Sequence, residues 1–321
     1  MEFLYVVNWA FVFYVSEWAI RLVMLFYVPQ RRNPAAARTW LLFIFVMPWI
    51  GLLIYAILGR AHLTRRRMEL HEKVSTFIKN IGKDFFTPHS TNPHFSEEFV
   101  LAIQLAKNLG DFPIVEGNHF EFLAGYHVSI DRLVADIAAA RHHVHLLYYL
   151  VGDDNTGNRV ANALIQAVKR GVHCRLLIDS LGSKRARRRL VPKMRAGGIE
   201  VLELLPVRFF RPNSWRMDLR NHRKLAVIDA RIGYVGSQNL VDANFKEGIT
   251  FEELVLRVTG PVVLELQAVF LADRYFEREA VLSDPGLFPA PERTGTMSGQ
   301  LLPSGPGYPQ ANTLRLIVAL V

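Results

Sequence analysis

Hydrophobic residues are concentrated in the first sixty positions of this 321-residue chain, in two long runs that begin at Phe3 and Thr39. Each run, FLYVVNWAFVFYVSEWAIRLVMLFYV and TWLLFIFVMPWIGLLIYAIL, is long enough as a helix to cross a hydrocarbon layer of about 30 Å. The pattern predicts a transmembrane hairpin over residues 1–60. Glu17 and Arg21 lie four positions apart in the first run, where they either pair on one helix face or mark a shallower, tilted insertion.

The first run does not resemble a signal peptide, because the start MEFLYVV carries no basic residue. More basic residues follow the second run than lie between the runs, which favours a cytoplasmic position for the rest of the chain. The single cysteine, Cys174, excludes an intramolecular disulfide and fits a reducing compartment. The net charge of +9 indicates an anionic partner, and beside a membrane anchor the nearest one is the lipid surface.

After the hairpin, residues 61–110 have mixed character and predict a juxtamembrane connector with a short helix at about residues 97–108. Beyond it, short apolar runs alternate with segments of helical spacing, which predicts an α/β domain over residues 111–295 with helices on both faces of a sheet. The expected strands cover residues 144–151, 172–180, 199–205, 222–229, 232–240 and 252–260. The expected helices cover residues 129–143, 158–171, 184–198 and 261–279, with Ser129 as an N-cap and Gly171 as a C-terminal stop.

Polar and small residues follow the first two of these strands. In an α/β sheet, the loops at the carboxyl ends of the strands form the ligand crevice. Turn or helix-cap roles explain these residues as well as ligand contacts do. They are Asp153, Asp154, Asp179, Ser180, Gly182 and Ser183.

The stretch NHRKLAVID carries the clearest candidate chemistry. Side chains two apart on a strand share a face, so His222 and Lys224 are expected to project together, with Asp229 near the far end. A neutral imidazole can attack phosphorus, and an adjacent ammonium stabilises the charge that develops on the non-bridging oxygens. In the GSQN sequel, Ser237 and Asn239 offer a hydroxyl and an amide that suit phosphate binding. The alternative is a polar strand edge without function.

The sequence RNHRKLAVIDARIGYVGSQN resembles the catalytic signature of the phospholipase D superfamily. The remainder is similar to bacterial cardiolipin synthases, through PWIGLLIYAILGR, GVHCRLLIDSLGS, FEELVLRVTGPVV and PSGPGYPQ. The resemblance covers nearly the whole chain and implies a phospholipase D-like α/β/α sandwich half with a mixed sheet. It implies that His222 is a nucleophile or general acid, that Lys224, Ser237 and Asn239 contact phosphate, and that Asp229 supports the site. Glu253 matches an acidic position that orients the partner histidine, although the family often has aspartate there.

The implied reaction transfers a phosphatidyl group from one phosphatidylglycerol, through a phosphohistidine, to the hydroxyl of a second, and glycerol leaves. No metal or organic cofactor is implied. The implied location is the bacterial inner membrane, crossed more than once, with the catalytic domain in the cytoplasm. The expected partners are phosphatidylglycerol and other anionic lipids, and nucleic acid is not expected.

The chain departs from the family in one respect. The family builds its site from two histidine motifs, because one histidine attacks while the other protonates the leaving group. No second His-x-Lys pair follows Asp229, and GYPQANTLRLIVALV resembles GYHVSIDRLVADIA near residue 125, as if residues 296–321 began a truncated second domain. Three alternatives follow: a homodimer that pairs two copies of His222, a phosphodiesterase that uses water as acceptor, and an inactive fragment that only binds anionic membranes.

Two other clusters have more than one interpretation. Between Lys184 and Arg195 there are seven basic residues and no acidic one, which fits a solvated helix face or the capture of anionic headgroups or nucleic-acid phosphates. The histidines at 142, 143 and 145 lack matching cysteine or carboxylate spacing, so they are interpreted as helix-end and strand residues and no metal site is predicted.

Overall fold

The computed structural model describes residues 8–32, 34–59, 65–81, 97–206, 220–305, 308 and 312–320. The chain forms two compact units, Met1–Leu63 and Thr64–Val321. The domain boundaries expected at residues 60, 110 and 295 stay predictions.

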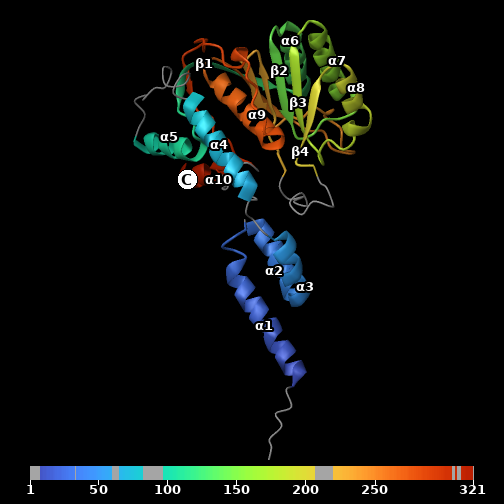
Figure 1. Ribbon diagram of the computed structural model, residues 1–321, viewed down its shortest axis with the longest axis vertical. Coiled ribbons are helices and arrows are strands. Elements are labelled where there is room, and N and C mark those ends of the chain that lie inside the picture. The colour runs from blue at the N-terminus through green and yellow to red at the C-terminus, as the bar shows by residue number, and fades with distance from the viewer. Residues whose placement is uncertain are drawn as a thin grey trace, which may run out of the picture. The chain divides into compact units, whose positions relative to one another are not determined.

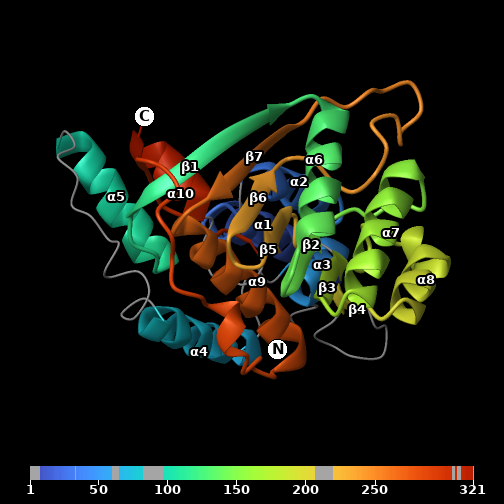
Figure 2. The ribbon, with the colours of Figure 1, turned by 90° about the horizontal axis from the view of Figure 1, so that it is seen from above.

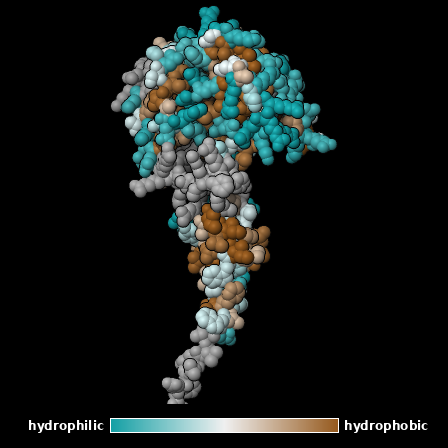
Figure 3. Space-filling view, turned by 45° about the vertical axis from the view of Figure 1, so that its right-hand side comes forward, coloured by the Kyte–Doolittle hydropathy of each residue, from teal (hydrophilic) through white to brown (hydrophobic). Residues whose placement is uncertain are grey.

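The first unit contains three apolar helices, α1 (Trp9–Tyr27), α2 (Pro34–Val46) and α3 (Pro48–Leu58) (Figure 1). Within the described residues, only α1, with 19 residues, is long and apolar enough to cross a membrane. It buries few side chains, among them Met24, and Figure 3 shows hydrophobic surface gathered over this unit. The helix expected from the first run is therefore present, and its length and apolar composition suit a hydrocarbon layer.

The second expected span is wrong as a single helix, because the chain breaks between α2 and α3 at Met47. Pro48 has no N–H to bond to the preceding turn, and its ring clashes with the carbonyl four residues earlier. The two helices then pack together so closely that a Cβ on Gly51 would lie 2.8 Å from Ile44 Cα. With 13 and 11 residues, α2 and α3 extend only about 20 and 16 Å.

The second unit is built on an eight-stranded sheet with the order β4-β3-β2-β5-β6-β7-β1-β8. Strands β2, β3 and β4 are parallel, and the other neighbouring pairs are antiparallel, so the sheet is mixed. The strands are β1 (Val115–Ala124), β2 (His143–Tyr148), β3 (His173–Asp179), β4 (Glu200–Leu204), β5 (Leu225–Ile228), β6 (Ile232–Gly236), β7 (Leu254–Thr259) and β8 (Met297–Gly299).

Helices cover both faces of this sheet (Figure 2). In β2, Val144 and Leu146 face the core formed with α6, α7 and α8, while Leu147 faces the core formed with α9 and α4. The alternation follows from the two-residue period of a strand and confirms the expected α/β/α sandwich. The helices are α4 (Arg65–Ile81), α5 (Glu97–Gly110), α6 (Tyr126–Ala139), α7 (Asn155–Lys169), α8 (Leu190–Ala196), α9 (Val262–Arg278) and α10 (Asn312–Leu320), with short 3₁₀ turns η3 (Ala186–Arg188) and η5 (Pro285–Leu287).

Two expected helix details are wrong. Ser129 does not cap α6, because the helix begins at Tyr126 and the Ser129 hydroxyl donates instead to the Tyr126 carbonyl. The helix expected over residues 184–198 is reduced to α8, because Pro192 lacks the N–H that a longer helix would need and is tolerated only in the first turn. Gly171 does follow the end of α7, with φ of +91°.

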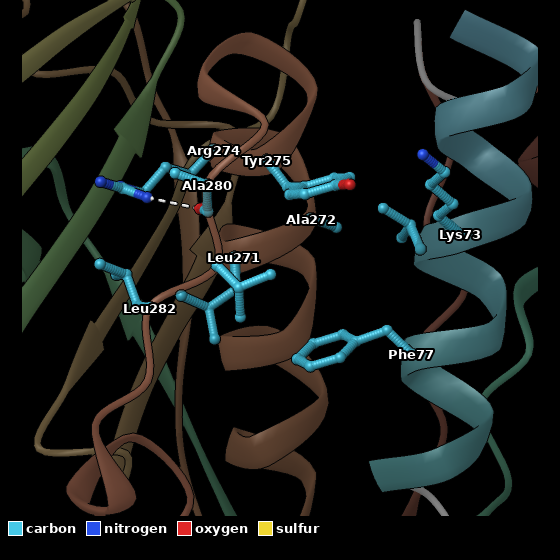
Figure 4. Close-up of a pocket in the computed structure, with 10 residues that line it drawn as sticks. Lys73, Phe77, Leu271, Ala272, Arg274, Tyr275, Ala280 and Leu282 are labelled. Carbon is cyan, nitrogen blue, oxygen red and sulfur yellow. Dashed lines mark hydrogen bonds between the residues drawn. The ribbon is translucent and has the colours of Figure 1, made fainter.

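Helix α4 packs on α9 through Leu70, Val74 and Ile78, which belong to the same core as α9. Beside this contact lies an apolar cavity of about 120 Å³, lined by Phe77 of α4 and Leu271 of α9 among others (Figure 4). None of the candidate site residues lines it. We therefore interpret this cavity as a gap in the packing of α4 and α9, separate from the candidate site.

Candidate active site

The segment that carries His222 is fixed by two buried aspartates from distant elements. Asp179, at the end of β3, forms an ion pair with Arg220 at 3.6 Å. Asp273, on α9, pairs with the Arg223 guanidinium and accepts a hydrogen bond of 3.0 Å from the Asn221 amide. Since ion pairs hold the chain on both sides of His222, its backbone is positioned before any ligand arrives.

The His222 ring lies on the ring of Tyr149, the residue that directly follows β2. The two centroids are 3.9 Å apart and the planes differ by 18°, so the rings are stacked. Burial lowers the pKa of His222 and the nearby Lys224 charge lowers it further, while Asp179 opposes them. Both main effects favour the neutral imidazole, which is the nucleophilic form, on a side chain exposed to solvent.

The strand expected over residues 222–229 is shorter, since β5 begins at Leu225, so His222 and Lys224 lie just before it, both near the Tyr149 ring. The Lys224 Nζ donates to the His222 carbonyl at 2.6 Å and lies 5.8 Å from the centroid of the Tyr149 ring. Burial lowers the pKa of Lys224, and the negative charge of Glu253, just before β7, opposes that shift. The structure thus brings His222, Lys224 and Glu253 into one region.

Asn239 faces the same small cavity as Lys224, of about 10 Å³. Its Oδ1 accepts the Leu150 N–H at 3.0 Å, which aims the amide nitrogen away from that bond and leaves its N–H donors without a partner among the described residues. Ser237 is engaged differently, because its Oγ accepts the Leu254 N–H of β7 at 3.2 Å. Asn239 is therefore the better placed of the two to donate to an anion.

Asp229 does not lie with His222 and Lys224, because it follows β5 at the opposite end of the strand. Its carboxylate accepts the backbone N–H groups of Arg141, His142 and His143 at 2.8 to 2.9 Å. It adopts a left-handed conformation with φ of +53°, which the tight turn into β6 requires. Asp229 thus fixes the start of β2 against β5 and can act on the site only through the strands.

Sequence reasoning did not find Tyr149, Arg220, Arg223 or Asp273, and it left Asp179 open between a turn and a ligand contact. Tyr149 lies in an apolar run, Asp273 lies on an expected helix, and the two arginines flank the motif without a distinguishing pattern. The signal for Asp179 was its position at the carboxyl end of a strand. It accepts the N–H groups of Leu181 and Gly182 as in an Asx turn, and in addition holds Arg220.

Near the start of β2, His142 is partly exposed, whereas His143 and His145 are buried. Gln267 of α9 lies between them, 3.0 Å from His145 and 3.3 Å from His143. Among the residues that the structure describes, no group of three or more His, Cys, Asp and Glu side chains has the geometry to hold a metal ion.

These buried histidines predict a loss of stability in mild acid. Burial lowers the pKa of His143 to about 4 and holds the pKa of His145 well below its usual range. As the pH falls below 6.5, these histidines bind protons in the unfolded chain but stay neutral in the folded one. The stability present above pH 6.5 is therefore lost between pH 6.5 and about 4. His143 alone accounts for about 3 kcal/mol.

Denaturant unfolding in detergent at pH 7 and pH 4.5 measures this effect. His143→Gln, which cannot titrate, is expected to show a smaller difference between the two pH values. An equal difference in the variant would show that other groups control the acid sensitivity.

Comparisons with known proteins relate two segments of the chain to known families. Residues 133–275 match the family described as cardiolipin synthase, PLD-like domain, and residues 18–60 match the phospholipase D-nuclease N-terminal family. Cardiolipin synthase A of Pectobacterium atrosepticum is 35% identical over 322 residues, or 95% of this chain and 64% of that protein. Cardiolipin synthase A of Yersinia pseudotuberculosis serotype IB is 34% identical, with the same coverage. The chain thus spans 64% of the length of these curated relatives.

Solved structures give weaker likenesses. Nuc from Salmonella typhimurium, a phospholipase D family member, has a TM-score of 0.39 and 18% identity, covering 49% of this chain and 94% of that one. Phosphatidylserine synthase from Haemophilus influenzae has a TM-score of 0.42 and 14% identity, covering 57% of this chain and 44% of that one. It is the matches in sequence, at 35% identity over 95% of the chain, that carry the relationship: residues 133–275 form a PLD-like domain of the cardiolipin synthase type.

Proposed function

We propose that this chain supplies half of a phosphatidyltransferase site, in which His222 is the nucleophile. Its support is the exposed, neutral imidazole stacked on Tyr149 with the Lys224 ammonium beside it. The substrate class is anionic phospholipid, by analogy with the cardiolipin synthases that the chain resembles. Membrane association follows from α1, which is long and apolar enough to span a bilayer.

The proposed reaction has two steps. A His222 nitrogen attacks the phosphorus of one phosphatidylglycerol, so a P–N bond forms, the P–O bond to glycerol breaks, and a general acid protonates the leaving glycerol oxygen. The hydroxyl of a second phosphatidylglycerol then attacks phosphorus and gives its proton to the same group, and the P–N bond breaks to restore His222. Lys224 and Asn239 donate to the non-bridging oxygens, on which charge develops.

The proposed general acid is a second histidine. A symmetric homodimer that brings two copies of His222 together would supply it, with Glu253 of each copy positioned to orient the imidazole. Asp229 and Ser237 are proposed as positioning residues, since their contacts are with the backbone of neighbouring strands. We further propose that the chain resides in a bacterial inner membrane with the second unit in the cytoplasm.

The test is incubation of the purified, detergent-solubilised chain with labelled phosphatidylglycerol, followed by lipid analysis and detection of acid-labile phosphohistidine. Cardiolipin and a phosphohistidine support the proposal. Phosphatidic acid in place of cardiolipin indicates that water is the acceptor and the chain is a phosphodiesterase. The absence of both product and covalent intermediate contradicts catalysis by this chain alone.

Gly182→Ala is expected to reduce phosphohistidine formation at least about tenfold. A Cβ at this position would lie 2.4 Å from the Tyr149 carbonyl oxygen and 3.0 Å from its ring, so Tyr149 must move and the support under His222 is lost. Quenched single-turnover labelling measures the rate. Tyr149→Phe keeps the stacked ring and is the matched control, expected to remain within about threefold of the unaltered chain. A normal rate in Gly182→Ala would exclude this role for Tyr149.

A further inference from the structure

A broad groove of about 1080 Å³ lies next to the candidate active site. Its walls come from the segment after β2 at Leu150, the loop after β3 at Gly182, and the segment after Asn239 that includes Asp242. Two contacts connect the groove with the site. The backbone N–H of Leu150, in the groove, donates to Asn239, and Gly182, also in the groove, packs against the Tyr149 ring that supports His222. A ligand in the groove therefore lies beside the reacting groups.

The seven basic residues between Lys184 and Arg195 divide into two groups. Three are held by the protein: Arg187 and Arg195 form ion pairs with Glu203 of β4, and Lys193 donates to the Asn158 side chain. The other four line the groove, are exposed, and have no ion pair or side-chain hydrogen bond to any described residue. They are Lys184, Arg185, Arg188 and Arg189.

Three acidic residues of the groove are hydrogen-bonded elsewhere in the protein and form no ion pair with these four cations. Asp154 caps α7 by accepting the Gly157 N–H, and Asp242 accepts the Thr156 N–H at 2.8 Å. Asp153 accepts the Asn158 amide at 3.3 Å. A fourth acidic residue, Glu247, lines the groove next to Lys246, and their opposite charges balance. The four cations therefore lie together in one segment of the groove without an ion pair, an arrangement that an anion stabilises.

The groove also exposes apolar side chains. Leu181 is 38% exposed and Phe245 is 39% exposed, and the Phe245 ring is stacked on Phe251 with centroids 4.8 Å apart. Cations beside exposed apolar groups suit an amphiphile with a negative headgroup better than a free phosphate or a nucleic-acid backbone.

We propose that the groove binds the phosphodiester headgroup of a second anionic phospholipid, the acceptor of the transfer reaction. The inference rests on the proposed function for the acceptor role, and on the groove itself for binding. A reaction between two anionic lipids must hold two phosphates, whereas Lys224 is one cation with a pKa already lowered by burial. Lys184, Arg185, Arg188 and Arg189 supply the charge that the second phosphate requires.

Binding is tested on the full chain in neutral detergent, with His222→Ala present so that no turnover occurs. Calorimetric titration uses short-chain phosphatidylglycerol, with short-chain phosphatidylcholine, inorganic phosphate and a single-stranded oligonucleotide as comparison ligands. Arg185→Ala/Arg188→Ala is expected to weaken phosphatidylglycerol binding about tenfold, which corresponds to about 1.4 kcal/mol. Arg187→Ala/Lys193→Ala removes the same charge outside the groove and is expected to remain within about twofold.

Equal weakening in both double variants, or none in either, overturns the proposal. Inorganic phosphate or the oligonucleotide binding as tightly as phosphatidylglycerol overturns the lipid assignment. With His222 restored, the groove variant is expected to form phosphohistidine normally and to transfer it to the acceptor about tenfold more slowly. If the unaltered chain forms no phosphohistidine, the proposed function fails, while the titration still decides whether the groove binds lipid.

Discussion

His222→Ala is expected to abolish phosphohistidine formation and to lower any phosphatidyl transfer by about a thousandfold or more. The variant removes the only protein atom proposed to bond to phosphorus and leaves Lys224 and Asn239 able to bind the substrate. Single-turnover labelling with phosphatidylglycerol measures the chemical step. The dissociation constant for the lipid should change far less than the rate, because binding depends on the cations.

The matched control is His119→Ala, which removes an exposed histidine from β1. It should leave both the rate and the bound phosphate unchanged. A phosphoenzyme that persists in His222→Ala, or that is lost equally in His119→Ala, would mean that another residue is the nucleophile.

Asp273→Ala is expected to cost about 3–5 kcal/mol of unfolding free energy, because it leaves a buried guanidinium without its counter-ion. The Arg223 side chain is 12% exposed and that of Asp273 is 6% exposed. The substitution also frees the Asn221 amide, so the segment around His222 keeps only the support of the Asp179–Arg220 pair. Denaturant unfolding of the detergent-solubilised chain measures the stability, and phosphohistidine labelling of the remaining folded protein is expected to slow as well.

Asp131→Ala provides a matched loss of an ion pair, since Asp131 pairs with Arg159 and its side chain is 60% exposed. An exposed pair of this kind contributes at most about 1 kcal/mol. Similar losses of stability in Asp131→Ala and Asp273→Ala would contradict the view that the Arg223 pair anchors the site.

The sequence determined much of the α/β core by local pattern. The apolar runs that became β2 and β3, and the helical spacing that became α9, are recognisable because each buries a continuous set of side chains. Strand β1 was missed, because VEGNHFEFLA has no regular alternation of apolar and polar residues. It is stabilised by pairing with β7 and β8, which lie more than a hundred residues away in sequence.

The apolar runs at the N-terminus predicted membrane helices, and Pro48 was the available warning that the second run would not be continuous. Only the tertiary structure decided that α2 and α3 fold against one another, because that depends on the space left by Gly51 next to Ile44. The length and hydropathy of a segment show how well it suits lipid. They do not show whether a break in the helix lets its second half fold back on its first half.

The sequence by itself also named His222 and Lys224 as candidates for the chemistry, although the strand expected to place them on one face begins only at Leu225. The tertiary structure decided what surrounds them. It placed Tyr149 under the imidazole, fixed the motif between Asp179 and Asp273, and put Asp229 at the other end of the strand. Contacts between residues tens of positions apart depend on strand order and helix packing, and no local periodicity encodes them.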